Sequence, residues 1–331
     1  MAKYLFGSFA ISVCLTLSLV AATTREPSHP EPSRKISEPF VSYSPQPQHF
    51  PNEGLYKAYL VIQRFKSRIS SDPKNITTTW SGHDICGRKT YLGFHCGRTP
   101  DLAKKLTIMA VDFNDFGLSA PMLEGFIDQF PDLVLFQASS NNKLTGPIPP
   151  SIMHMQDFLL EMHLLNNQLS GCLPNELGML TKTAVIDAGM NQLTGPIPSS
   201  FSCLNSVEQL NLGGNRLYGQ VPDALCKLAG PAGRLSNLTL SGNYFTSVGP
   251  ACSALIKDGV LDVKYNCIPG VANQRAAAEC ASFLSQPKTC PAANARVVCP
   301  AADAKKNAAA APEGTAARDY SSYVTYATLH E

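Results

Sequence analysis

The chain has 331 residues, of which 44% are hydrophobic, so it has enough apolar surface for a core and wholesale disorder is excluded. The formal net charge is only +2 and charged residues make up 16% of the chain. Bulk charge therefore gives no support for binding to nucleic acid or to a membrane surface, and we expect no nucleic-acid partner.

Residues 1–22 have the order of a secretory signal peptide. One lysine precedes an apolar stretch, and the small residues Ala21 and Ala22 follow it, so we expect cleavage after Ala22. An uncleaved membrane anchor is the alternative, but the apolar run is shorter than the ~20 residues that a span needs. The sequence thus predicts a secreted, extracellular protein without membrane insertion.

Residues 23–52 contain seven prolines and few apolar residues, and we expect them to form an extended, hydrated linker. Residues 53–104 follow as a predicted amino-terminal cap that begins with a helix. The helix is indicated by apolar side chains at helical spacing, namely Leu55, Tyr59, Ile62, Phe65 and Ile69. Pro73 lies just beyond its expected end.

Two cysteines of the cap, Cys86 and Cys96, follow Trp80. In an oxidising compartment we expect them to form a disulfide that closes the end of the core. A zinc site made by these cysteines with His83 and His95 is the alternative, but the spacing matches no common zinc finger. We therefore expect neither a metal nor a cofactor.

Residues 105–266 repeat the pattern L-x-L-x-x-N at intervals of 27, 26, 24, 24, 28 and 23 residues. The repeated asparagines are Asn114, Asn141, Asn167, Asn191, Asn215, Asn243 and Asn266. In such a repeat each short strand turns two apolar side chains inward, and the asparagine turns inward to bond the backbone. Stacking the units ~4.8 Å apart gives a parallel sheet.

A second signature follows four of these asparagines, in KLTGPIPPSI, QLSGCLPNEL, QLTGPIPSSF and RLYGQVPDAL. It resembles the L-x-G-x-I-P segment of the plant-specific class of leucine-rich repeats. That resemblance implies a second small strand in each unit. The predicted fold is an α/β solenoid of about seven plant-type leucine-rich repeats, with a parallel sheet on the concave face and disulfide-rich caps.

The concave face is the candidate binding surface, because the side chains between the buried positions point outward. Counted back from the repeated asparagines, the outward residues with polar or charged side chains include Asp112, Gln137, Glu161, His163, Asp187 and Asn211. Three carboxylates and a histidine thus form an acidic strip on adjoining strands, suited to a basic ligand. An ordinary solvated sheet face is the alternative.

Ten cysteines remain after removal of the signal peptide. Cys203, Cys226 and Cys252 lie at similar offsets from their asparagines, so any adjacent two could pair. We assign Cys267, Cys280 and Cys290 to a carboxyl-terminal cap over residues 267–299. No neighbouring repeat has a cysteine opposite Cys172, and we expect it to be strained, free or intermolecular.

Two acceptor sequences for N-glycosylation fit the secretory route, Asn75-Ile76-Thr77 and Asn237-Leu238-Thr239. Enzyme motifs such as G-x-S-x-G, H-E-x-x-H and the P-loop do not occur in the sequence. Carboxylates on an open sheet face are also poorly placed to act as general acids. We therefore expect no catalysis.

Over residues 53–290 the chain resembles the amino-terminal domain of the plant leucine-rich repeat extensins. The segments that carry the resemblance are LYKAYLVIQRFKSRISSDPKNITTTWSGHDICGRKTYLGFHCG, SVEQLNLGGNRLYGQVPDALCKL and YNCIPGVANQRAAAECASFLSQPKTC. Residues 300–331 are Ala-rich and expected to be disordered, unlike the family's Ser-Pro-rich tail. The resemblance is thus to a relative that lacks the extensin module.

The resemblance implies a secreted, wall-associated protein whose concave face binds a rapid-alkalinisation-factor (RALF-type) peptide, a small, basic, cysteine-rich signal. It also implies a membrane receptor kinase as a further partner. The alternative function is inhibition of a pathogen's polygalacturonase, since such inhibitors use the same repeat. They have more, and more regular, repeats than this chain and lack its Cys-Ile-Pro-Gly cap. A passive structural wall protein is a third interpretation.

Overall fold

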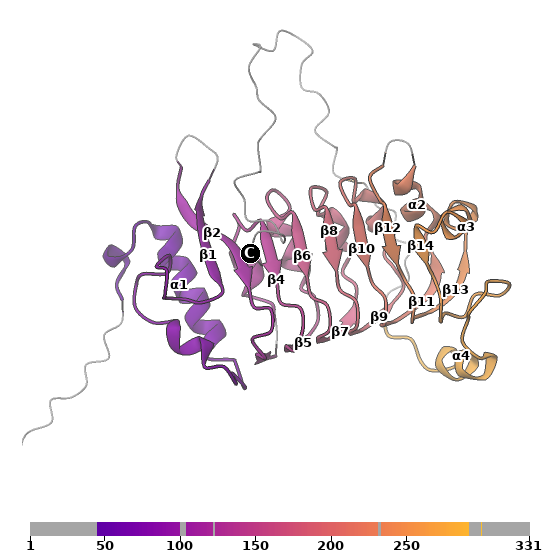
Figure 1. The fold of residues 1–331 in the computed structure, drawn as a ribbon, viewed down its shortest axis with the longest axis horizontal. Coiled ribbons are helices and arrows are strands. Elements are labelled where there is room, and N and C mark those ends of the chain that lie inside the picture. Colours follow the sequence, from indigo (N-terminus) through magenta and orange to yellow (C-terminus); the bar gives the residue numbers. More distant parts are fainter. Residues whose placement is uncertain (1–44, 100–103, 122, 231–232, 291–298, 300–331) are drawn as a thin grey trace, which may run out of the picture. The chain divides into compact units, whose positions relative to one another are not determined.

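The computed structural model describes residues 45–99, 104–121, 123–230, 233–290 and 299. The expected signal peptide, the tail at 300–331 and most of the linker lie outside these residues. Among the helices that are described, none is long and apolar enough to cross a membrane. The described residues form two largely parallel sheets joined by short helices, as expected for a leucine-rich repeat solenoid (Figure 1).

The amino-terminal cap packs its helix α1 (Glu53–Lys66) onto the first repeats. The Asn52 side chain accepts a hydrogen bond from the backbone N–H of Leu55 at 3.0 Å and so caps the helix. Phe65 stacks on Phe126 with ring centroids 3.8 Å apart, which covers the open end of the core. The 3₁₀ helix η2 (Ile76–Thr79) follows, and the expected bond between Cys86 and Cys96 is present.

The prediction that the linker extends to residue 52 is wrong at its end. A 3₁₀ helix, η1 (Pro47–His49), lies within that range, and Phe50 is 7% exposed. The Phe50 ring packs beside Tyr56 and Tyr59 of α1 at centroid distances of 5.4 and 5.3 Å. Burial of the Phe50 ring against the helix lowers the free energy by more than hydration of an extended segment would.

The concave sheet has eight strands, stacked in the order in which they occur in the chain (Figure 1). Its strands are β1 (Phe94–Arg98), β2 (Leu106–Asp112), β4 (Leu135–Gln137), β6 (Glu161–His163), β8 (Val185–Asp187), β10 (Gln209–Asn211), β12 (Asn237–Thr239) and β14 (Leu261–Asp262). Strand β1 is antiparallel to β2, and the rest of the sheet is parallel. Apolar side chains from Val111 on β2 to Leu261 on β14 point into the core at matching positions.

The asparagine ladder lies beneath this sheet and differs from prediction at its first two members. The buried ladder residues are Asn142, Asn167, Asn191, Asn215, Asn243 and Asn266. Asn191 is typical: its Oδ1 accepts from the backbone N–H of Leu169 at 3.0 Å, and its Nδ2 donates to the carbonyl of Leu164 at 2.9 Å. The bonds thus join each unit to the one before it.

Asn141, predicted to be in the ladder, is exposed and donates instead to Asp115. The reason is one extra residue in this unit, accommodated by left-handed backbone at Ser140 and Asn141, both with φ of 56°. Asn114 is also outside the ladder. Val111 pairs with Phe136, so the first strand lies two residues out of the predicted alignment.

The L-x-G-x-I-P segments form the second sheet, as the resemblance implied. Its strands are β3 (Ser119–Ala120), β5 (Lys143–Gly146), β7 (Gln168–Cys172), β9 (Gln192–Gly195), β11 (Arg216–Val221) and β13 (Tyr244–Val248). The motif's glycine has a positive φ of 84–96° at Gly146, Gly171, Gly195 and Gly219. Only glycine adopts such a backbone without strain, which explains its place in the motif.

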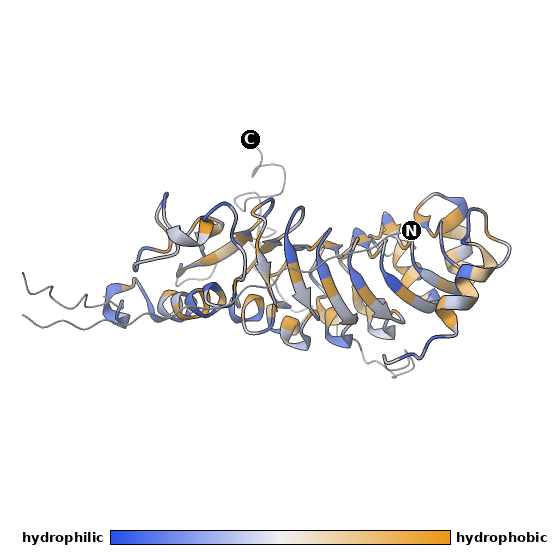
Figure 2. Ribbon diagram, turned by 90° about the horizontal axis from the view of Figure 1, so that it is seen from below, coloured by the Kyte–Doolittle hydropathy of each residue, from blue (hydrophilic) through white to orange (hydrophobic). Residues whose placement is uncertain are grey.

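Short helices complete each unit. They are η3 (Ile127–Gln129), η4 (Pro150–Met155), η5 (Asn175–Met179), η6 (Ser199–Cys203), α2 (Asp223–Cys226), η7 (Lys227–Ala229) and α3 (Pro250–Lys257). Figure 2 shows hydrophobic and hydrophilic stretches alternating along the repeats. This alternation is what a coil with one buried and one solvated side in each element requires.

The carboxyl-terminal cap contains α4 (Ala277–Leu284) and a disulfide between Cys267 and Cys280. Cys226 bonds Cys252, which is one of the adjacent pairings considered from the sequence. Arg275 donates to the carbonyls of Asn243 and Gly242 at 2.8 and 3.0 Å, which satisfies backbone acceptors at the end of the stack.

Cys172 corrects the expectation of a strained, free or intermolecular thiol, because it is bonded to Cys290. Cys290 is therefore not confined to the carboxyl-terminal cap: it lies against the second sheet, where a Cβ added to Gly195 would be 2.8 Å from its Sγ. Cys203 likewise bonds Cys299 rather than a cysteine of an adjacent repeat. The chain after α4 is thus fastened to earlier repeats at two points.

Candidate functional site

The candidate site is a row of outward-facing residues across the concave sheet, which we call the central row. Successive strands place its members in register. The row consists of Asp112, Gln137, His163, Asp187, Asn211, Thr239 and Asp262. Parallel pairing fixes this alignment because outward residues alternate with the buried apolar ones.

Five of the six predicted ligand-binding residues lie in this row. Asp112 belongs to the row because its Cα is paired with that of Gln137. The predicted alignment had placed Asp112 two residues further along the strand, at the next outward position. Glu161 lies two residues before His163 on the same face of β6, and its Cα is paired with that of Val185. The predicted residues are therefore close neighbours on adjoining strands.

Gln137 corrects the prediction of a direct ligand contact, because its side chain is fully buried. Its Oε1 accepts from Asn114 Nδ2 at 2.8 Å, and Asn114 Oδ1 accepts from the backbone N–H of Ser139 at 2.8 Å. Asn114 thus fixes the position of the Gln137 side chain at the edge of the face. The residue can hold its neighbours in place, but a ligand cannot reach it.

Glu161 and His163 form the best-defined polar pair on the face. Glu161 Oε2 and His163 Nε2 are 3.1 Å apart, and the two side chains are 24% and 16% exposed. The pair is an ion pair only when the imidazole is protonated. Because both groups are partly desolvated, the arrangement positions the carboxylate more firmly than a fully exposed pair could.

Asp187 is the other well-organised acid. Burial raises the pKa of its carboxyl, against the lowering effects of the Gly189 N–H, the His163 charge and the Asn211 side chain. Gly189 has a steric role too: a Cβ at this residue would lie 2.7 Å from Asn211 Nδ2. The glycine therefore leaves room for Asn211 beside Asp187.

The charge of the face has one sign over β2 to β10. Its outward positions on these strands, all within the described residues, include three carboxylates and no lysine or arginine. Partly buried carboxylates with free acceptor capacity attract cations and accept hydrogen bonds from them. The arrangement is suited to binding a basic surface.

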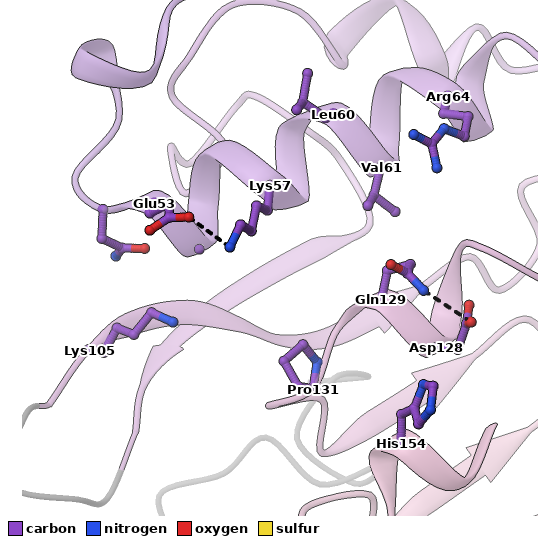
Figure 3. A pocket seen from close by; sticks show the side chains of 12 residues that line it. Glu53, Lys57, Leu60, Val61, Arg64, Lys105, Asp128, Gln129, Pro131 and His154 are labelled. Carbon is purple, nitrogen blue, oxygen red and sulfur yellow. Dashed lines mark hydrogen bonds and ion pairs between the residues drawn. The ribbon is translucent and has the colours of Figure 1, made fainter. Parts of the chain in front are cut away.

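A second surface of different character lies between α1 and the first repeats (Figure 3). It is a groove of about 890 Å³ whose lining includes Lys57, Leu60, Arg64, Asp128 and His154. Lys57 is paired with Glu53 at 2.7 Å, and the two side chains are 70% and 78% exposed. An ion pair so open to solvent contributes little to stability and does not hold its side chains in a fixed position. We therefore place the binding site on the concave face and not in this groove.

The alternative zinc site is not supported. Cys86 and Cys96 are joined to each other, so neither can act as a thiolate ligand. In the part of the chain that the structure describes, no group of three or more His, Cys, Asp or Glu side chains could hold a metal ion.

Two features of the face were not expected from the repeat pattern as aligned on Asn114 and Asn141. The repeat pattern assigns Asn114 to the ladder. When the positions of the first unit are counted from Val111 instead, Asn114 falls at an outward position on the surface. Asn237 was singled out only as a glycosylation site, yet it lies six residues before Asn243, as Glu161 lies six before Asn167. That offset places it on the concave face.

Comparison with known proteins agrees with the repeat assignment. A family model, Leucine Rich Repeat, matches residues 206–228. The chain is 34% identical over 107 residues to leucine-rich repeat extensin-like protein 2 of Arabidopsis thaliana, covering 32% of this chain and 13% of that protein. It is 33% identical over 115 residues to leucine-rich repeat extensin-like protein 1 of the same plant, covering 35% and 15%. The chain thus aligns with only a small part of the length of these relatives.

Among solved structures, the chain is similar to the leucine-rich repeat ectodomain of the Arabidopsis thaliana membrane receptor kinase GASSHO1/SCHENGEN3, crystallised with CASPARIAN STRIP INTEGRITY FACTOR 2. The TM-score is 0.51 at 25% identity, covering 64% of this chain and 24% of that one. These similarities support a protein-interaction role for the repeat region and are consistent with secretion.

Proposed function

Because the repeat region is homologous to that of the plant leucine-rich repeat extensin-like proteins, we propose that this chain is a secreted, cell-wall-associated recognition protein. Its ligand is a small, basic, cysteine-rich signalling peptide of the RALF type, held on the concave face. The observation that carries the proposal is the single sign of charge across β2 to β10, where three carboxylates have no lysine or arginine among them.

The contacts follow from the geometry of the central row. Glu161, Asp187 and Asp112 receive the basic side chains of the peptide, and Asn211 offers an amide for a backbone hydrogen bond. His163 holds Glu161 in place at 3.1 Å. Gln137 supports the row from below. Long-range attraction also speeds the encounter with a basic ligand, so the association rate should fall as salt is added.

The partner set extends beyond the peptide. In this proposal the chain acts as a carrier or sink for the peptide, or as a co-receptor beside a membrane receptor kinase. These roles differ in whether the bound peptide remains available to a second protein. The concave face serves all of them, because each requires capture of the peptide first.

The experiment is calorimetric titration of the secreted full-length chain with a panel of basic RALF-type peptides. We expect sub-micromolar binding to at least one peptide, and loss of that binding in the double variant Glu161→Lys and Asp187→Lys. The matched control is Glu124→Lys with Asp157→Lys, two exposed acids away from the concave strands that change the net charge equally.

Equal loss in both double variants would show that net charge, rather than this face, governs binding. The absence of binding with every peptide would contradict the proposal outright. A polygalacturonase assay on the same samples tests the alternative function, and loss of that enzyme's activity without peptide binding would assign the chain to the inhibitor class.

A further inference from the structure

The second glycosylation sequence lies on the concave face. Asn237 is the first residue of β12 and is exposed, and its Cα is paired with that of Gln209 on β10. Thr239, the third residue of the acceptor sequence, is a member of the central row. Residues two apart on a strand point to the same side of the sheet, so both project from the face that we propose binds the peptide.

We propose that an N-linked glycan on Asn237 covers the carboxyl-terminal part of the concave face and confines the peptide to strands β2 to β10. The confinement of the peptide rests on the proposed function, whereas the glycan and its cover do not. The modification forms a bond between Asn237 Nδ2 and the anomeric carbon of an oligosaccharide carried on a lipid pyrophosphate. The lipid pyrophosphate leaves, and the amide nitrogen loses one proton.

The side chain of Asn237 is arranged to accept this group. Its Oδ1 accepts a hydrogen bond from the Thr239 hydroxyl at 3.1 Å, and the described residues show no bond from its Nδ2. Gln209, which is paired with Asn237 on the same face, is exposed, and so is Ser236, which precedes Asn237 in the chain. A bulky glycan can therefore project from the sheet at Asn237 without displacing any buried side chain.

Spacing determines what such a glycan covers. Neighbouring strands lie ~4.8 Å apart. Strand β8, which carries Asp187, is therefore about 10 Å from strand β12, which carries Asn237, and strand β2 with Asp112 is about 24 Å from β12. Thr239 and Asp262 lie directly beside the attachment site, with Asp262 paired to Thr239. A glycan at Asn237 thus covers Asp262 most closely and Asp112 least.

Asn75 provides an internal comparison. It is exposed and belongs to the amino-terminal cap, where it precedes η2 with a left-handed φ of 54°. It is not part of the concave sheet. A glycan at Asn75 is therefore expected to have no effect on the face.

The first test is the mass of tryptic peptides from the full chain secreted by a plant host, before and after a peptide N-glycosidase. We expect the peptide containing Asn237 to carry a removable glycan that is lost in Asn237→Gln. Labelling of carboxylates with a carbodiimide and an amine then reports cover. Asp262 should label faster in Asn237→Gln than in the wild type, and at an unchanged rate in Asn75→Gln. Asp112 should label equally in all three.

The second test moves the glycan by one strand. Gln209→Asn with Asn211→Thr creates an acceptor sequence on β10, and Gln209→Asn with Asn211→Ala is its control without one. Both β10 variants lack Asn211, so they are compared with each other. We expect peptide binding to be retained in Asn237→Gln, and to be weaker in the β10 variant that carries the glycan than in its control without one.

An unmodified Asn237, or Asp262 labelling that the glycan does not change, would overturn the proposed cover. Unimpaired peptide binding with a glycan on β10 would overturn the proposed footprint. If no variant and no wild-type sample binds peptide, the proposed function fails, and the glycan and its cover are still decided by mass and labelling.

Discussion

Asp187 and Gly189 are two residues apart on the concave face, and the backbone N–H of Gly189 donates a hydrogen bond to Asp187 Oδ1 at 3.1 Å. The same arrangement recurs one strand further on, where Gly213 donates to Asn211 Oδ1 at 2.9 Å. A polar residue followed by glycine at this offset thus holds its side chain against the sheet and leaves its outer edge free for a ligand.

The carboxyl of Asp187 makes stability depend on pH. Burial raises its pKa above the ordinary value of 3.8, so the folded protein keeps this proton at a pH at which the unfolded chain has lost it. The group therefore stabilises the fold most in acid, and this contribution is lost as the pH rises through the interval between the unfolded and folded values. A tenfold difference in proton affinity corresponds to about 1.4 kcal/mol.

We expect the free energy of unfolding of the wild type to decrease relative to that of Asp187→Asn as the pH rises from about 3.5 to 7. Urea denaturation of both proteins at several pH values measures the difference. A difference that stays constant, or that changes in the opposite sense, would show that the favourable bond from Gly189 outweighs burial.

Gly189→Ala should weaken peptide binding through Asn211. The new Cβ would lie 2.7 Å from Asn211 Nδ2 and 2.9 Å from its Oδ1, so that side chain must move away from Asp187. We expect a loss of stability of about 1 to 3 kcal/mol, as for other overpacked sites, together with weaker binding. Gly249→Ala is the matched control, since its Cβ would meet Asp223 Oδ1 and so overpack a polar side chain outside the central row. Equal effects of the two variants on binding would contradict the role of Asn211.

Asn142→Ala and Asn141→Ala separate the true ladder residue from its neighbour. Asn142 is 4% exposed, donates to the carbonyl of Phe113 at 2.8 Å and accepts from the N–H of Leu118 at 3.0 Å. Its removal leaves buried groups unpaired, at about 1 to 3 kcal/mol for each. Asn141→Ala should cost less, about 1 kcal/mol, because alanine tolerates the left-handed backbone at this position less well than asparagine does. Chemical denaturation measures both variants, and a larger loss in Asn141→Ala would reverse the assignment.

The bond between Cys172 and Cys290 spans 118 residues, whereas that between Cys226 and Cys252 spans 26. In the chain-entropy account the longer loop restricts the unfolded chain more, by about 1.3 kcal/mol. We therefore expect Cys172→Ser with Cys290→Ser to lower the free energy of unfolding more than Cys226→Ser with Cys252→Ser. Thermal or urea unfolding of the two double variants makes the comparison. The reverse order would show that local packing outweighs loop length.

Much of the fold could be predicted from the sequence, because the same local pattern of residues occurs in each repeat. The apolar pairs and inward asparagines from Asn167 onward are where the period places them, and the glycine of L-x-G-x-I-P marks a positive φ. Leu55, Ile62 and Phe65 of the cap helix are buried, as their spacing predicted. Each of these features depends on neighbours within one unit or the next.

Only the tertiary structure decided the features that depend on register and on distant contacts. One extra residue moved the ladder from Asn141 to Asn142, and a shift of the first strand brought Asp112 into the central row while Gln137 became buried. Cys172 found its partner 118 residues away because the chain after α4 returns across the second sheet. The sequence by itself determined the repeating unit, since short-range periodicity encodes which side chains are buried. The composition of the binding face required the structure, since it depends on how successive units align in space.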